Sequence, residues 1–300
     1  MTSSGSEMRV DNVQLYGQFV LHLGEVVSGS LKTGDAVVCS VDYVRRGPIA
    51  SNHTMTHVLN YALKKVLAED GSVAIDQKGS FQDELKSRFD FSWNGPVTAK
   101  QLAEVEKVCI EQIQKALPVQ SYVSPLEAAK KIGSLRAVFG EKYPDPVRVV
   151  AIAHNPVPEM LADPANSEWN DFSVEFCGGT HLANTKEAEA FALLSEEGIA
   201  KGIRRIVFVT QGDAKKAIAD AAVFEAKLEK AAAIDGEALE PEVKMLSQEL
   251  STLTVSAVKR TEFRETIASF SKKITAYKKQ KLAGMTDEIV GQMVVAAEAT

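Results

Sequence analysis

The sequence predicts an α+β protein with a β-rich beginning, a mixed middle and a helical end. Three observations lead to this prediction. Apolar and polar residues alternate over 12–42, and helix-like and strand-like segments mix in the next part of the chain. Towards the end, alanine, lysine and glutamate recur at helical spacing with little glycine or proline. We therefore expect three domains, which cover 1–46, 47–212 and 213–300.

Composition places the chain among ordinary globular proteins. It has 300 residues, of which 45% are hydrophobic and 25% charged, so it can bury a substantial core. It has no long apolar run and no signal-peptide pattern, so we expect no membrane association and a cytoplasmic location. The net charge of -6 argues against nucleic-acid binding driven by bulk charge, although a local basic patch remains compatible with it.

The β-rich beginning contains turn sequences such as "SGS" and "KTGD" between alternating segments, which is typical of short antiparallel strands. A helix follows in "SNHTMTHVLNYALKKV", where Ser51 or Asn52 is suited to cap its start and Gly71 to end it. His53 and His57 are four residues apart and therefore share one helical face. Such a pair can hold a metal ion, but it also occurs as ordinary helix surface.

Further elements complete the mixed middle. "KSRFDFSW" predicts a strand, 98–117 predicts a helix capped by Thr98, and Ser124 with Pro125 opens a short helix. "RVVAIA", "DFSVEFC", "EAFALL" and "GIRRIVFVT" are expected as strands of one sheet. The helical end is expected to form a hairpin or coiled coil, which offers a route to homo-association.

Three cysteines, Cys39, Cys109 and Cys177, do not have the spacing of a disulfide framework. Cys39 and Cys109 fall on strand-like and helix-like patterns where a small apolar side chain serves packing. Cys177 is different, because "VEFCGGTHLANT" places it four residues before His181 across two glycines that permit a tight turn.

Taken alone, this second motif is also compatible with a simple turn that contains a buried cysteine. Together with the helix, the motif provides three imidazoles and one thiolate, a set suited to tetrahedral zinc. A metalloprotease of the H-E-x-x-H type is excluded, because Thr54 follows His53 where that motif requires the catalytic glutamate.

Five segments carry a family resemblance: "SNHTMTHVLNYAL", "DQKGSFQDELKSRFDFS", "SLRAVFGEKYPDPVRVV", "EFCGGTHLANT" and "EEGIAKGIRRIVFVT". Over roughly residues 12–212 they resemble the editing domain of alanyl-tRNA synthetase, which also occurs in free-standing alanyl-tRNA editing proteins. The resemblance implies a partial small β-barrel module, an α/β-sandwich editing domain and a coiled-coil-like helical extension. It also implies hydrolysis of Ser-tRNA(Ala) and Gly-tRNA(Ala), the mischarged forms of the tRNA.

The resemblance assigns roles to particular residues. It implies zinc at His53, His57, Cys177 and His181, and it places Gln77 and Thr56 beside the reacting ester. From the residues alone, Gln77 is equally compatible with a turn, and the Thr56 hydroxyl with a hydrogen bond to its own backbone. In "GIAKGIRRI", Lys201, Gly202, Arg204 and Arg205 are expected to contact RNA through cations and close backbone approach.

Two functions remain open at this point. The first is a zinc-dependent aminoacyl-tRNA deacylase, and the second is a non-catalytic tRNA-binding or assembly module stapled by zinc. ATP-dependent aminoacylation is not expected from this chain alone, because the resemblance does not include the family's ATP-binding domain. Met55 departs from the small residue usual in the family and is expected to reshape the space beside the metal.

Overall fold

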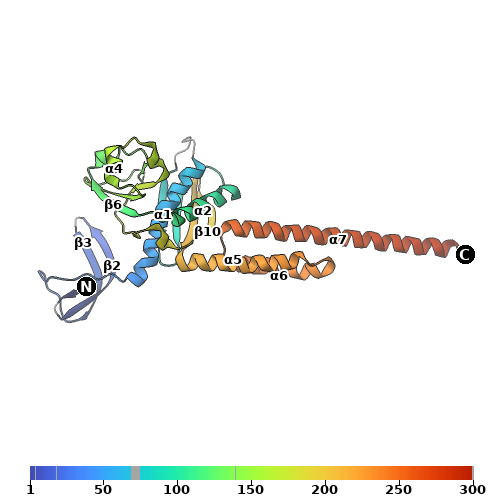
Figure 1. Cartoon of the computed structure of the whole chain (residues 1–300). Coiled ribbons are helices and arrows are strands. Elements are labelled where there is room, and N and C mark those ends of the chain that lie inside the picture. Colours follow the sequence, from blue (N-terminus) through green and yellow to red (C-terminus); the bar gives the residue numbers. More distant parts are fainter. Residues whose placement is uncertain (4, 18, 69–74, 139, 299–300) are drawn as a thin grey trace. The chain divides into compact units, whose positions relative to one another are not determined.

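A computed structural model describes the whole chain except residues 4, 18, 69–74, 139 and 299–300. The described residues form two compact units, Met1–Arg46 and Gly47–Thr300 (Figure 1). The mixture of helices and sheets in them confirms the predicted α+β class. No helix in the described ranges combines the length and apolar character needed to cross a membrane.

The first unit is a three-stranded antiparallel sheet in the order β1 (Thr2–Ser3), β2 (Ser6–Tyr16) and β3 (Phe19–Ser28). In the described structure, the segment 31–42 contacts this sheet through a single bridge, between Val38 and Thr2. The strands predicted in this segment are therefore absent. Cys39 is exposed there, which corrects its expected packing role. Within the described residues the sheet does not close into a barrel, and the barrel module stays a prediction.

The second unit contains two four-stranded sheets, where the sequence predicted one. In the first sheet, β10 (Phe191–Ala200), β11 (Ile203–Thr210), β5 (Ser87–Ser92) and β4 (Gln77–Gln82) lie in that order, all antiparallel. The second sheet has the order β6 (Val119–Ser124), β8 (Val147–Ile152), β9 (Ser173–Phe176) and β7 (Leu135–Arg136). In it, only the β7–β9 pair is parallel.

The division into two sheets follows from pairing that local patterns do not specify. Strand β9 pairs with β8, whereas β10 pairs with β11, so the segment between β9 and β10 connects one sheet to the other. Each sheet has its own hydrophobic core. Phe89, Phe91 and Phe208 belong to the first core, and Val149 and Val174 to the second.

Helix α1 (Tyr43–Leu67) begins well before the predicted caps Ser51 and Asn52. Both residues are buried inside the helix and use their side chains elsewhere: Ser51 Oγ donates to Thr210 Oγ1 at 2.8 Å, and Asn52 Nδ2 to the Asp83 carbonyl at 2.9 Å. The helix ends at Leu67, and Gly71 lies outside the described residues. Met55 is fully buried in the first core.

Helix α2 (Ala99–Gln114) confirms the predicted cap, since Thr98 Oγ1 accepts from the Gln101 amide and the Gln101 side chain bonds back to Thr98. Cys109 is buried on this helix, as expected. Two short helices, α3 (Leu126–Ala129) and α4 (Val157–Ala162), belong to the part of the chain that holds the second sheet.

The helical end consists of α5 (Gln211–Ala232), α6 (Leu239–Thr252) and α7 (Ala257–Glu298) (Figure 1). Helix α5 starts directly after β11, without a linker. A third core around Phe224, Leu246 and Phe263 joins the three helices into a packed three-helix arrangement. The predicted hairpin or coiled coil therefore stays a prediction. Short 3-10 turns cover Ser167–Asp171, Thr185–Ala188 and Gly236–Ala238.

Candidate metal centre

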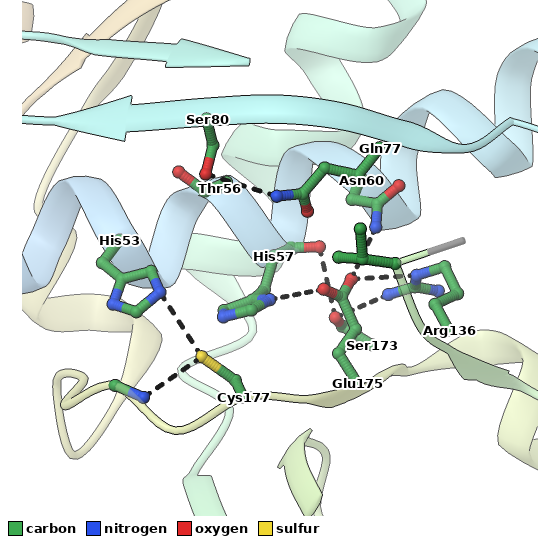
Figure 2. A network of polar contacts seen from close by, with 12 residues as sticks. His53, Thr56, His57, Asn60, Gln77, Ser80, Arg136, Ser173, Glu175 and Cys177 are labelled. Carbon is green, nitrogen blue, oxygen red and sulfur yellow. Dashed lines mark hydrogen bonds and ion pairs between the residues drawn. The ribbon is translucent and has the colours of Figure 1, made fainter. Parts of the chain in front are cut away.

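The structure brings the four predicted metal ligands together. His53 and His57 extend from one face of α1 towards Cys177, which lies in the loop after β9 (Figure 2). His181 follows Cys177 in the same loop. The centroids of the three imidazole rings lie 4.5 to 5.1 Å apart. One ligand atom from each of the four residues lies within 4.8 Å of the others. Segments about 120 residues apart in the sequence therefore converge on one point.

Three of the six distances between the donor atoms match those of a tetrahedral zinc site. Ordinary zinc bond lengths place nitrogen ligands about 3.3 Å apart and a nitrogen about 3.6 Å from a sulfur in a tetrahedron. The Nε2 atoms of His57 and His181 are 3.1 Å apart. Cys177 Sγ lies 3.5 Å from His53 Nε2 and 3.6 Å from His181 Nε2. Three nitrogens and a thiolate sulfur also form a donor set that zinc prefers, so the residues fit this metal.

The loop that holds Cys177 depends on Gly179. A Cβ atom at Gly179 would lie 2.3 Å from His53 Cε1, whereas a Cβ at Gly178 would meet nothing within 4 Å. The Gly179 amide also points to Cys177 Sγ at 3.4 Å. Arg148 supports the loop from the other side, donating to the carbonyls of Cys177 and Gly179. Of the two glycines, only Gly179 lies so close to His53 that a larger residue would clash.

A buried carboxylate orients one of the metal ligands. Glu175 Oε2 lies 2.6 Å from His57 Nδ1, which leaves His57 Nε2 facing the cluster (Figure 2). Glu175 Oε1 accepts from Asn60 Nδ2 and from Arg136 Nε, each at 2.9 Å. Arg136 also donates to Ser173 Oγ at 2.7 Å. This carboxylate–histidine arrangement is common at zinc sites, where it sets the tautomer and orientation of the ligand.

The electrostatics of the cluster favour the thiolate. Burial raises the pKa of Cys177, but hydrogen bonds from His181, His53 and His57 outweigh it and lower the pKa to about 3. Burial likewise opposes ionisation of Glu175, but His57 and Arg136 lower its pKa to about 2. Burial lowers the pKa of His57, but Glu175 and Cys177 outweigh it and raise the pKa to about 10. Zinc binds a thiolate and neutral imidazole nitrogens, so binding at this cluster requires release of the His57 proton.

Sequence reasoning did not predict Glu175, Arg136, Asn60 or Arg148. Glu175 has one local signal, since it is the charged residue of a strand whose four residues are all buried. Arg136 and Arg148 have none, because their partners are set by how β7, β8 and β9 pair.

Gln77 and Thr56 lie on facing elements near the cluster. Gln77 starts β4, is half-buried, and donates from Nε2 to Ser80 Oγ at 3.3 Å. Figure 2 shows its side chain extending from the strand towards α1. Thr56 is buried, and its hydroxyl donates to the Asn52 carbonyl at 2.8 Å and accepts from Gln82 Nε2 at 3.1 Å. The alternative expectation for Thr56, a bond to its own backbone, is thus what the structure contains.

The residues expected to contact RNA lie on the β10–β11 hairpin. Lys201 and Gly202 form its turn, and Gly202 has a φ of +72°, a backbone conformation suited to glycine. Arg204 and Arg205 are engaged in ion pairs. Arg204 binds Glu196, and Arg205 donates from Nε and Nη2 to the two carboxylate oxygens of Asp90, at 2.7 and 2.8 Å.

Comparison with known proteins adds independent information. Residues 147–207 match the family model described as the threonyl and alanyl tRNA synthetase second additional domain, and residues 214–277 match the one described as the alanine–tRNA ligase domain. The mitochondrial alanine–tRNA ligase of Saccharomyces cerevisiae is 45% identical over 270 residues, which is 90% of this chain and 27% of the relative. The chain belongs to the alanyl-tRNA synthetase family.

Other members of the alanyl-tRNA synthetase family give the same picture. The cytoplasmic alanine–tRNA ligase of Dictyostelium discoideum is 45% identical over 86% of this chain and 27% of its own length. That of Drosophila melanogaster is 36% identical over 100% of this chain and 31% of its own length. The chain thus spans about three tenths of the length of these relatives. The first family model contains Cys177 and His181, but not the histidines of α1.

Proposed function

We propose that this chain hydrolyses the ester bond of tRNA(Ala) mischarged with serine or glycine, at a zinc ion held by His53, His57, Cys177 and His181. The convergence of these four donors within 4.8 Å of one another, in a chain of the alanyl-tRNA synthetase family, carries the proposal. A synthetic pocket sized for alanine discriminates only weakly against a residue one methyl smaller or one hydroxyl larger. A second, hydrolytic site removes the resulting errors.

Each side chain of the cluster has a defined task in this proposal. The three imidazoles and the thiolate bind the ion, and Glu175 keeps His57 Nε2 directed at it through the 2.6 Å contact with Nδ1. Bound zinc would supply Lewis-acid polarisation of the substrate or a lowered pKa for a water ligand. Arg148 and Gly179 keep the loop in the shape that presents Cys177 Sγ.

Gln77 orients the reacting groups in this proposal. Its carboxamide carries both a donor and an acceptor, and Ser80 Oγ occupies one donor position. The remaining positions are suited to hydrogen-bond an attacking water or the aminoacyl carbonyl. An amide is a poor base, so Gln77 contributes orientation and not proton abstraction.

Thr56 has a smaller role in the proposal. Its hydroxyl is already bonded to the Asn52 carbonyl and to Gln82 Nε2, and Ser87 Oγ lies 3.2 Å away. To bond the hydroxyl of a serine substrate, Thr56 must exchange one of these contacts. We therefore expect Thr56 to affect selectivity for serine less than Gln77 affects rate.

The β10–β11 hairpin is proposed to hold the RNA. Lys201 offers an exposed cation, and Gly202 allows the backbone to approach a phosphate closely. Arg204 and Arg205 keep part of their guanidinium donors engaged with carboxylates, so their contribution to phosphate binding is reduced by these ion pairs.

One observation favours a second candidate function. Four protein donors form a closed tetrahedral set, which is usual for structural zinc, whereas catalytic zinc keeps one position open. In this alternative the ion has a structural role and cross-links α1 to the loop after β9. The chain then binds tRNA or assembles with partners without catalysis.

Release of serine from preformed Ser-tRNA(Ala) tests the proposal. The wild-type chain is compared with Gln77→Ala, with Ala-tRNA(Ala) as the substrate control and Gln280→Ala on exposed α7 as the matched variant. We expect Gln77→Ala to lower the rate about tenfold or more, the scale for losing one orienting group, with zinc content and tRNA affinity unchanged. No hydrolysis by a folded, zinc-loaded wild-type chain would favour the binding module.

A further inference from the structure

A pocket lies away from the four metal ligands, at the C-terminal half of α1. It has a volume of about 390 Å³ and is bounded by α1, the residues just before and in β7, and the 3-10 turn Ser167–Asp171. None of His53, His57, Cys177 or His181 lines it. Neither the proposed hydrolysis nor the proposed RNA hairpin uses this pocket.

Cations dominate the lining of this pocket. Lys64, Lys65 and Arg136 line it, against the single carboxylate of Asp171 among the described residues. Lys65 Nζ is 3.8 Å from Asp171 Oδ1 and 3.2 Å from the Tyr61 hydroxyl. Lys64 has no ion-pair partner in the described structure, which omits 69–74. Burial, and then the nearby charge of Arg136, lower the pKa of Lys64, as expected for two cations that face a shared space.

Arg136 contributes donors to this pocket in addition to those it uses at the metal centre. Its Nε binds Glu175 and its Nη2 binds Ser173, on the side of the guanidinium that faces the metal centre (Figure 2). A guanidinium has five N–H donors in a planar fork, so these two contacts leave others for a ligand. Planar, bidentate donation of this kind suits phosphate.

An unpaired hydroxyl provides an independent observation. Ser134 lines the pocket and is 2% exposed, and its Oγ has no hydrogen-bond partner among the described residues. A buried hydroxyl without a partner is unfavourable, and native structures usually satisfy such groups with protein, water or a ligand. An oxyanion in the pocket would supply the missing acceptor.

We propose that this pocket is a phosphate-binding site, formed by Lys64, Ser134 and Arg136 with Lys65 at its edge. Two cations and a hydroxyl donate to the phosphate oxygens. The phosphate belongs either to an RNA backbone or to a free phosphate ion, since both present the same chemistry to the pocket. This site does not depend on hydrolysis at the metal centre, although the two sites share Arg136.

Equilibrium dialysis with labelled inorganic phosphate tests the site on the full, zinc-loaded chain. The variants are Lys64→Gln and Ser134→Ala, and the matched control is Lys100→Gln, an exposed lysine on α2. We expect Lys64→Gln to weaken phosphate binding about tenfold, as for the loss of one charged donor, and Lys100→Gln to leave it unchanged. Cys177→Ala should also keep phosphate binding, which separates this site from phosphate coordination by zinc.

A second arm identifies the source of the phosphate. Binding of unacylated tRNA is measured for the wild type and Lys64→Gln, with and without added phosphate. Parallel weakening of tRNA binding, together with competition by phosphate, assigns the site to an RNA backbone. Unchanged tRNA binding with weakened phosphate binding assigns it to a free ion. If Lys64→Gln, folded by circular dichroism, binds both ligands as the wild type does, the proposal is overturned.

Discussion

Glu175 shows how a single buried side chain sets the geometry of the candidate metal centre. It is 5% exposed, and its two oxygens contact His57, Asn60 and Arg136. A carboxylate this deeply buried is tolerated because each oxygen has a charged or amide donor. The consequence is that the His57 ring is held with Nε2 directed at the other donors.

Substitution of Glu175 by glutamine should weaken metal binding. The amide keeps the size of the side chain but removes the charge, and loss of such a supporting contact usually costs about 10–100-fold in metal affinity. Competition with a chromophoric zinc chelator measures this directly. Glu127→Gln, on exposed α3, is the control and should bind zinc as the wild type does. Equal zinc affinity in both variants would contradict the role of Glu175.

The two adjacent glycines of the loop differ in how closely they approach His53. Gly179→Ala introduces a methyl group 2.3 Å from His53 Cε1, so His53 or the loop must move, whereas Gly178→Ala meets open space. We expect Gly179→Ala to lose zinc affinity by about tenfold or more, the scale of a displaced metal-site contact, and Gly178→Ala to change it little. Zinc content after dialysis against a weak chelator distinguishes the two. Similar behaviour of both variants would show that close packing against His53 is unimportant.

Among the elements, α2 connects the first sheet to the helical end through Glu106. Its Oε1 accepts from the Leu193 amide on β10 at 2.9 Å, and it also bonds Ser256 just before α7. Burial raises the pKa of Glu106, and the bond from Leu193 only partly offsets this. The folded state therefore binds the Glu106 proton more tightly than the unfolded state does.

The sign of the resulting pH dependence follows from linkage. The contribution of Glu106 to stability is favourable below its ordinary pKa of 4.5 and declines as pH rises through its higher folded-state pKa. Glu106→Gln keeps the acceptor but cannot ionise, so its free energy of unfolding should fall less than that of the wild type between pH 4.5 and neutrality. Urea unfolding at several pH values in this range measures the difference. Parallel curves would contradict the prediction.

The candidate metal centre lies between two separately packed cores of the molecule. The histidine helix contributes Met55 and Leu59 to the first core, and Cys177 directly follows Phe176 of the second. Both belong to the unit Gly47–Thr300. An ion bound across this junction stabilises the folded state of the unit, because the unfolded chain does not present the four ligands together.

Removal of zinc should therefore lower the melting temperature of this unit. An ion present at 1,000 times its dissociation constant stabilises by about 4 kcal/mol, which for a unit of this size corresponds to roughly 10 °C. Calorimetry with and without a strong chelator measures the shift. Cys177→Ala provides the control, since its transition should barely respond to the chelator.

The exposed part of α7 carries a stripe of apolar residues. Leu282, Met285, Ile289 and Met293 are all more than half exposed and recur at spacings of three and four residues. This pattern is typical of a helix that packs on another, so we expect homo-association through α7. Sedimentation should show Ile289→Glu with a lower mass than the wild type, and Gln280→Glu, on the opposite helical face, unchanged. Equal mass for all three chains would contradict the association.

Several local features of this protein follow from its sequence alone. The His53–His57 spacing, the Thr98 cap and most strands of the middle follow from side-chain periodicity and capping, which act over a few residues. The cluster of four candidate metal ligands could also be predicted from the sequence, because two short motifs and the family resemblance specify it without any knowledge of packing.

The division into sheets and the partners of the buried polar side chains depend on the tertiary structure. It divided the strands into two sheets. It also placed the start of α1 before Ser51, whose hydroxyl bonds Thr210, 159 residues away, and does not cap the helix. It also placed Glu175 beside His57 across 118 residues. Such partners depend on which strands pair and how the helices pack on them. No local pattern encodes those choices, because a buried polar group acquires its partner only when the whole unit has assembled.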